Sequence, residues 1–108
     1  MSLDMYIDKC RNPKIVDGKH DYEERVEMCY WSGFYGLLQH GLPFTYGNEE
    51  CGDDIHLSKK DVEQILNYVA RNRDRFDSFD SVTQVCKLLD QYDELKEDGW
   101  IVCFNASW

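Results

Sequence analysis

The sequence lacks the segments that would place a chain in a membrane or direct it to secretion. No run approaches the about 18 consecutive apolar residues that a transmembrane helix needs. The opening Met1-Ser2-Leu3-Asp4 has neither the basic region nor the apolar stretch of a signal peptide. We therefore expect a cytoplasmic protein without a membrane partner.

Paired cysteines are missing as well. The cysteine count is 5, an odd number, and no Cys-x-x-Cys occurs. A secreted disulfide framework uses an even number of cysteines, so it is not the expected arrangement. We expect reduced and mostly buried thiols at Cys10, Cys29, Cys51, Cys86 and Cys103.

Recognisable catalytic and cofactor motifs are absent from the sequence. There is no Gly-x-x-x-x-Gly-Lys-Ser/Thr phosphate loop and no Gly-x-Gly-x-x-Gly dinucleotide loop. The Gly-x-Ser-x-Gly nucleophile elbow, the His-Glu-x-x-His zinc motif and the zinc deaminase pattern are missing too. We therefore assign no catalytic residue and expect no cofactor.

The best candidate for a metal site is the segment from Cys51 to His56. Asp53 and Asp54 lie between these two residues, and His40 is close enough in sequence to join them through the fold. Structural zinc sites usually show paired short Cys or His spacings, whereas this Cys-x₄-His stands alone. An ordinary acidic turn that enters a strand therefore competes with a small metal-dependent enzyme built around Cys51 and His56.

Positive charge is scarce. Lys and Arg number 12 against 21 Asp and Glu, so the formal net charge is −9. At long range such a surface repels nucleic acids and anionic lipids. It favours a basic protein partner, including a nucleic-acid-handling complex with a basic groove. The alternative is that the charge only keeps a small protein in solution.

The sequence does contain the pattern of one small α+β domain over residues 1–108. Period-two alternation predicts strands over 2–9 and 24–31, with a helix from Tyr22 as the alternative for the second. Asn12-Pro13 and Asp17-Gly18 indicate a loop between the strands. In the second strand we expect Val26, Met28 and Tyr30 on one face, and Arg25, Glu27 and Cys29 on the other.

Three helices follow from the remaining pattern. A short one begins at Ser32 and continues to about His40, before Gly41 and Pro43. Ser58 and Asp61 have capping-box spacing. The two longer helices have apolar stripes at Val62, Ile65, Leu66 and Val69, and over 79–97 at Val82, Val85, Leu89 and Tyr92.

Two further strands complete the predicted fold. Ile55-His56-Leu57 is a short one, and Gly99 ends the last helix before a strand from Trp100 to Trp108. Apolar residues on both faces of that last strand indicate an interior position in the sheet. The predicted order is β–β–α–β–α–α–β, an about four-stranded sheet with three helices packed on it.

Carboxylates gather in two places, and aromatic residues accompany one of them. The acids late in the 79–97 helix oppose the helix dipole, so local helix stability does not explain them. Exposed aromatics beside acidic residues are typical of protein-binding surfaces. The candidate partner-binding residues are Phe44, Tyr46, Glu49, Glu50, Asp53 and Asp54 in the loop, and Asp90, Asp93, Glu94 and Glu97 in the helix.

Several short blocks of the sequence form a recognisable series. They are Ser2-Leu3-Asp4-Met5-Tyr6, Tyr30-Trp31, Cys51 with Ile55–Ser58 and the Lys59–Arg71 helix, and Gly99–Trp108 with its Ser-Trp ending. Together they resemble a group of small bacterial and phage proteins of uncharacterised function. The group often has Arg-Lys after its Tyr-Trp pair, where this chain has Ser32-Gly33. The resemblance implies a strand over 24–31 and a phage or prophage origin, and it implies no activity.

These observations together predict a non-enzymatic, phage-borne inhibitor of the anti-defence or anti-CRISPR type. Its acidic, aromatic surface would block a basic host protein. The alternatives are the metal-dependent enzyme and a homo-oligomeric scaffold protein that buries its exposed aromatics in a symmetric interface, so a homodimer remains open.

Overall fold

The computed structural model describes residues 3–33, 36–44, 53–72 and 79–108, without the side chains of residues 79 and 80. These described residues form four strands and three helices in the predicted order, so the α+β fold is confirmed. The elements are β1 (Asp4–Val16), β2 (Lys19–Ser32), the π-helical turn η1 (Leu37–Gly41), β3 (Ile55–His56), α1 (Lys59–Arg71), α2 (Phe79–Glu97) and β4 (Ile101–Ser107).

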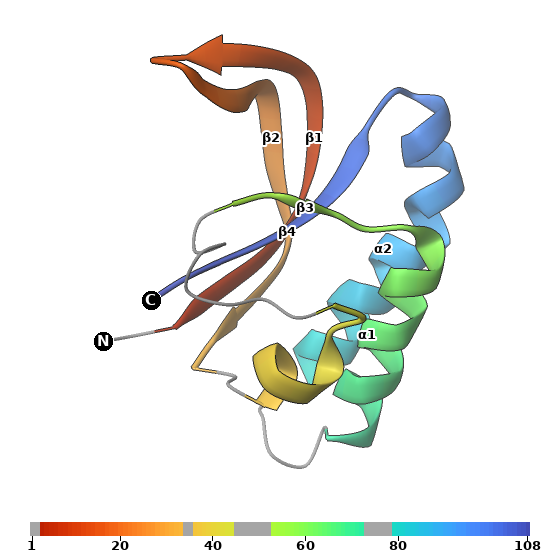
Figure 1. Ribbon diagram of the computed structural model, residues 1–108. Coiled ribbons are helices and arrows are strands. Elements are labelled where there is room, and N and C mark those ends of the chain that lie inside the picture. Colours follow the sequence, from red (N-terminus) through yellow and green to blue (C-terminus); the bar gives the residue numbers. More distant parts are fainter. Residues whose placement is uncertain (1–2, 34–35, 45–52, 73–78) are drawn as a thin grey trace.

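The strands make one antiparallel sheet in the order β2-β1-β4-β3. The first and last strands of the described residues are therefore the two central ones, and the interior position predicted for the last strand is confirmed. The helices α1 and α2 pack side by side on one face of the sheet (Figure 1). No helix of the described residues lies on the opposite face, where polar residues of the strands gather.

The core lies between this sheet and the two long helices. The sheet contributes Met5 and Ile7 of β1, and Leu3 immediately before this strand joins them, all at 0% exposure. Burial of such side chains contributes about 1.5–3 kcal/mol each. The same cluster includes Val62, Ile65 and Val69 of α1, Val85, Leu88 and Leu95 of α2, and Phe104 and Ala106 of β4.

The β1–β2 hairpin is longer than predicted. The strands continue past Asn12-Pro13 and turn only at Asp17-Gly18, whose φ values are 53° and 77°. Positive φ at both central residues is the geometry of a tight hairpin turn, which favours Asp-Gly. The expected loop at Asn12-Pro13 is wrong because β4 pairs with β1 only as far as Cys10. Beyond that point no described strand pairs with this side of β1, and a proline is tolerated there.

A β-bulge in β2 overturns the predicted faces of this strand. Ile7 pairs with Cys29, but the next residue, Asp8, pairs with Glu27, so Met28 has no partner in β1. One extra residue shifts the alternation by one position. Cys29 therefore points into the core, whereas Arg25 and Glu27 lie on the opposite face of the sheet.

The short first helix begins later than predicted. Ser32 pairs with Asp4 as the last residue of β2, and Gly33 follows with φ of 70°. The helical residues are Leu37–Gly41, so Ser32 is not their cap. Gly41 is buried at the point where this turn meets α1, and a β-carbon there would lie 2.6 Å from Tyr68 Cδ1.

The ends of the long helices confirm the sequence signals. Ser58 and Asp61 form a complete capping box at the start of α1. At the end of α2, Gly99 adopts φ of 83°, and its N–H bonds to the carbonyl of Lys96. Trp100 N–H reaches the carbonyl of Leu95, which completes the glycine-dependent helix ending and directs the chain into β4.

Candidate functional site

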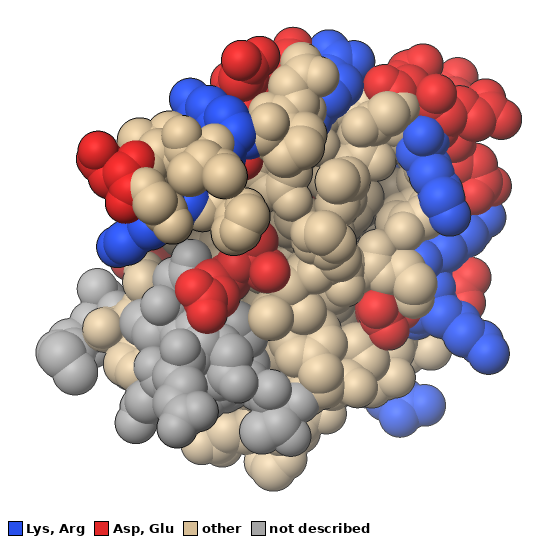
Figure 2. All heavy atoms as spheres, turned by 45° about the horizontal axis from the view of Figure 1, so that its top comes forward, with Lys and Arg blue, Asp and Glu red and all other residues tan. Residues whose placement is uncertain are grey.

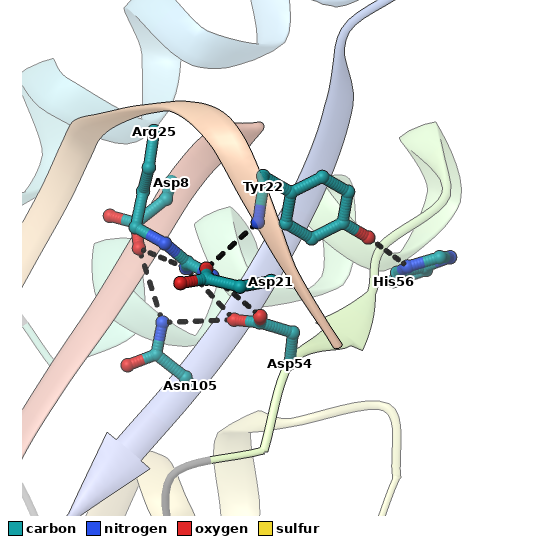
Figure 3. A network of polar contacts seen from close by, with 7 residues as sticks. All are labelled: Asp8, Asp21, Tyr22, Arg25, Asp54, His56 and Asn105. Atoms are coloured by element: carbon teal, nitrogen blue, oxygen red, sulfur yellow. Dashed lines mark hydrogen bonds and ion pairs between the residues drawn. The ribbon is translucent and has the colours of Figure 1, made fainter. Parts of the chain in front are cut away.

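The helix-free face of the sheet carries a polar network centred on Arg25 (Figure 3). Arg25 Nη1 lies 3.0 Å from Asp8 Oδ2 and 3.0 Å from Asp54 Oδ1, while Nη2 lies 2.7 Å from Asp54 Oδ2. Nη2 also lies 3.3 Å from Asp21 Oδ1. The pair with Asp54 is bidentate, which is the strongest geometry for these two groups. The hydrogen bonds to Asp54 and Asp8 raise the pKa of Arg25 despite its partial burial.

Asn105 of β4 joins the two central carboxylates. Its side-chain amide donates to Asp8 Oδ2 at 3.1 Å and to Asp54 Oδ1 at 3.4 Å. Asp8 is only 5% exposed, and a carboxylate so buried requires paired charge and hydrogen bonds. The network therefore links β1, β2 and β4 to Asp54, which immediately precedes β3.

Tyr22 and His56 extend this network toward the hairpin. The Tyr22 hydroxyl and His56 Nε2 share a hydrogen bond of 3.0 Å. Arg25 lies over the Tyr22 ring at 5.7 Å from its centroid. Burial, together with the neighbouring Cys103, raises the pKa of Tyr22 to about 12, so the phenol stays protonated near neutral pH.

Cys103 and Cys29 have the properties of buried structural thiols. Cys10 and Cys103 are both at 0% exposure, and a hydrogen bond between them together with burial raises the pKa of Cys103. Burial also raises the pKa of Cys29 to about 12. A nucleophilic thiol needs a lowered pKa and access to solvent. Cys103 and Cys29 have neither property.

Two hollows lie beside the network. One has a volume of about 450 Å³ and is lined by Tyr6, Asp8, Arg25, Glu27, Asp54 and Asn105. The other has a volume of about 800 Å³ and lies between the hairpin end, residues 18–22, and residues 53–56. Both volumes are within the range of about 300–1,000 Å³ typical of small-ligand sites.

The predicted metal segment is engaged in other contacts where the structure describes it. Asp54 is paired with Arg25, and His56 bonds to Tyr22. Within the described ranges, no three His, Cys, Asp or Glu side chains lie close enough together to hold a metal ion. Cys51 lies outside the described residues.

The predicted partner-binding residues of the loop fall into three groups: residues outside the described part of the chain, residues held within the protein, and one exposed residue. Glu49, Glu50 and Tyr46 lie outside the described residues. Phe44 is half-buried and packs edge-on against Phe104, with 5.9 Å between the ring centroids. Asp53 is exposed, whereas the Asp54 side chain is only 18% exposed because Arg25 holds it. Phe44 and Asp54 therefore contribute to packing and to the network.

The predicted acidic residues of α2 are all exposed. Asp90, Asp93, Glu94 and Glu97 have the spacing i, i+3, i+4, i+7, which places them on one helix face. Asp93 Oδ2 lies 2.9 Å from Lys59 Nζ, in an exposed ion pair with α1. In Figure 2, red carboxylate groups are densest at the upper right, where Figure 1 places the C-terminal end of α2.

Sequence reasoning did not find Arg25, Asp8 or Asn105 as partners. These residues are 17 or more positions apart in the chain, and no motif relates them. Only the register of β1 against β2 and β4 brings them together. No signal in the sequence marked Asp8, which is one of several charged residues in its strand.

Comparisons of the chain with protein-family models, with curated proteins and with solved structures found no match. Among the helices that the structure describes, none is long and apolar enough to cross a lipid bilayer.

Proposed function

We propose that the protein is non-enzymatic and acts by binding a basic protein through the carboxylates at the end of α2. The observation that carries this proposal is the arrangement of Asp90, Asp93, Glu94 and Glu97. All four side chains are exposed, and they form one acidic stripe on a single helix face.

This stripe lowers the stability of its own helix. Like charges at i, i+4 are destabilising by about 0.2–0.5 kcal/mol per pair. Negative charge near a helix C-terminus opposes the macrodipole by a similar amount. In the described part of the chain, only Asp93 of these four is in an ion pair. An arrangement that is unfavourable within the helix supports a role outside it, in contact with positive charge on a partner.

The partner that this surface fits is a basic host protein, in particular one whose groove holds nucleic acid. Spaced carboxylates would occupy phosphate positions in such a groove and exclude the nucleic acid. We propose that the protein is a phage-borne inhibitor of a bacterial defence system, of the anti-CRISPR type, that acts in the host cytoplasm. The net charge of −9 and the resemblance to small phage proteins support this proposal.

Affinity capture with matched variants tests the binding surface. The double variant Asp90→Lys/Glu94→Lys reverses two charges of the stripe, and Glu23→Lys/Glu63→Lys makes the same change in net charge on exposed residues elsewhere. We expect the wild type and the Glu23/Glu63 variant to retain the same basic protein from a bacterial lysate. We expect the Asp90/Glu94 variant to lose it. Equal capture by all three proteins would contradict the proposed surface.

A plaque assay tests the biological role separately. A bacterial host with an active CRISPR system that targets a phage would express the wild-type protein or the Asp90→Lys/Glu94→Lys variant. We expect the wild type to restore plaque formation and the variant not to restore it. If the wild type binds a basic protein but leaves plaque formation unchanged in hosts of several CRISPR types, the binding proposal stands and the anti-CRISPR proposal fails.

A further inference from the structure

The hollow of about 450 Å³ on the helix-free face has an excess of negative charge. Its lining contains three carboxylates, from Asp8, Glu27 and Asp54, and one cation, Arg25. Arg25 is itself held by Asp8, Asp54 and Asp21, so its charge is already matched. Glu27 is exposed and takes part in no ion pair with the described residues.

One acceptor in this pocket is open although its residue is buried. Asp8 is 5% exposed, and both of its hydrogen bonds to described residues end on Oδ2. Asp8 lines the pocket, and its Oδ1 has no hydrogen bond to another described residue. The two bonds on Oδ2 hold the carboxylate in place, so Oδ1 can accept a hydrogen bond from a ligand.

An aromatic wall completes the pocket. Tyr6 lines it, and the Tyr30 ring supports the Tyr6 ring at a centroid distance of 5.1 Å. The Tyr30 hydroxyl donates to Asp4 Oδ1 at 2.6 Å, which fixes the position of the second ring. A planar cation gains from stacking on such a ring as well as from nearby carboxylates.

We propose that this pocket is a binding site for a guanidinium group. Glu27 and Asp8 Oδ1 accept its N–H donors, and the face of Tyr6 stacks on its plane. A guanidinium fits better than an ammonium because it is flat, is weakly hydrated and donates in a fork. Arg25 shows the same chemistry within the chain, since one guanidinium there is bound by three carboxylates. The site is distinct from the α2 stripe, and the inference does not depend on that stripe.

An NMR titration of the ¹⁵N-labelled protein tests the site with defined probes. The first probe is N-acetylarginine amide, the second is a five-residue peptide with a central arginine, and the third is the same peptide with citrulline, which is neutral and nearly isosteric. We expect both arginine probes to shift the amides of Tyr6, Glu27 and Asn105, and the citrulline peptide to leave them unchanged. If the arginine peptide binds more tightly than N-acetylarginine amide, the natural ligand is an arginine within a protein segment. If the two probes bind equally, the natural ligand is a free small molecule with a guanidinium group.

Matched variants identify the groups responsible. Glu27→Gln removes one lining carboxylate, and Glu23→Gln makes the same change on the same strand outside the pocket. We expect Glu27→Gln to weaken arginine binding by about threefold or more, and Glu23→Gln to leave it unchanged. Tyr6→Leu should weaken it as well, with dispersed spectra showing that the variant is folded.

Three results would overturn the proposal. They are binding of citrulline equal to that of arginine, no shifts at millimolar arginine, and arginine-dependent shifts confined to the exposed acids of α2. The last result would leave the acidic-stripe proposal intact, because it would show that arginine binds to the stripe and not to the pocket.

Discussion

The side-chain amide of Gln84 makes both hydrogen bonds that a neighbouring strand would make with the backbone of Tyr30. Tyr30 N–H lies 3.3 Å from Gln84 Oε1, and Gln84 Nε2 lies 3.2 Å from the Tyr30 carbonyl oxygen. Tyr30 belongs to β2, which is an edge strand of the sheet. A free edge offers unpaired backbone groups to other chains, and native proteins cover such edges. Here a side chain of α2 covers one position of the edge.

Replacing Gln84 by alanine should therefore both destabilise the protein and expose this edge. We expect the free energy of unfolding to fall by about 1 kcal/mol, the typical net contribution of such hydrogen bonds. We also expect light scattering to show more self-association at high protein concentration. Gln91→Ala is the control, because Gln91 is exposed two helical turns later in α2. Equal urea denaturation midpoints for the two variants would contradict the role of Gln84.

Replacing Arg25 by glutamine should weaken the junction between the sheet and Asp54. The substitution leaves Asp8 buried without its cation. Loss of one partner of a fully buried pair costs about 3–5 kcal/mol, and Arg25 is about a third exposed, so we expect about 1–3 kcal/mol. Urea denaturation at neutral pH measures this loss. Lys19→Gln removes the same charge from an exposed position in β2, and its loss should be much smaller.

Glu24 should contribute stability that depends on pH. Its hydrogen bonds and ion pair with Arg11 hold the pKa of Glu24 below its usual value. A lowered folded-state pKa means that the stabilisation is fully present above the unfolded-state pKa of about 4.3. It disappears as the pH falls through the lower folded-state value. We therefore expect the stability difference between wild type and Glu24→Gln to be constant from pH 7 to about 5 and to vanish in stronger acid.

The control for this prediction is Glu23→Gln, a neighbouring exposed position in the same strand. Denaturation curves at several pH values for the three proteins provide the comparison. A stability difference for Glu24→Gln that stays the same down to pH 2 would show that the ion pair with Arg11 is not its source.

Replacing Gly41 by alanine should disturb the contact between η1 and α1. The new β-carbon would lie 2.6 Å from both Leu37 Cδ1 and Tyr68 Cδ1, closer than carbon atoms can approach. Overpacking of this kind costs about 1–3 kcal/mol. The melting temperature should therefore fall, whereas Gln39→Ala on the exposed side of the same turn should change it little. An unchanged melting temperature for Gly41→Ala would place Tyr68 farther from this glycine.

The parts of the fold that follow from neighbouring residues were predictable. The capping box of Ser58 and Asp61, the turn at Asp17-Gly18 and the helix ending at Gly99 all depend on a few adjacent positions. The interior position of β4 was also predictable, because a strand with apolar residues on both faces is typically buried on both faces.

The candidate site depends on relations that the sequence does not display. The bulge at Met28 places Arg25 and Glu27 on the face opposite the helices. No residue type in the strand predicts a bulge at that position. A single position of register separates a core residue from a surface residue. Asp54 was predicted as an exposed partner-binding acid, yet the pairing of β2 with β1 brings Arg25 to it.

The sequence by itself determined the α+β class, the order of the elements, the start of α1, the end of α2 and the acidic stripe on α2. These features depend on periodicity and on contacts within a few residues. Only the tertiary structure decided which carboxylates remain exposed and which are bound within the protein. Asp90 and Glu94 face solvent, whereas Asp8 and Asp54 are bound by Arg25, because strand register brings together charges from distant parts of the chain.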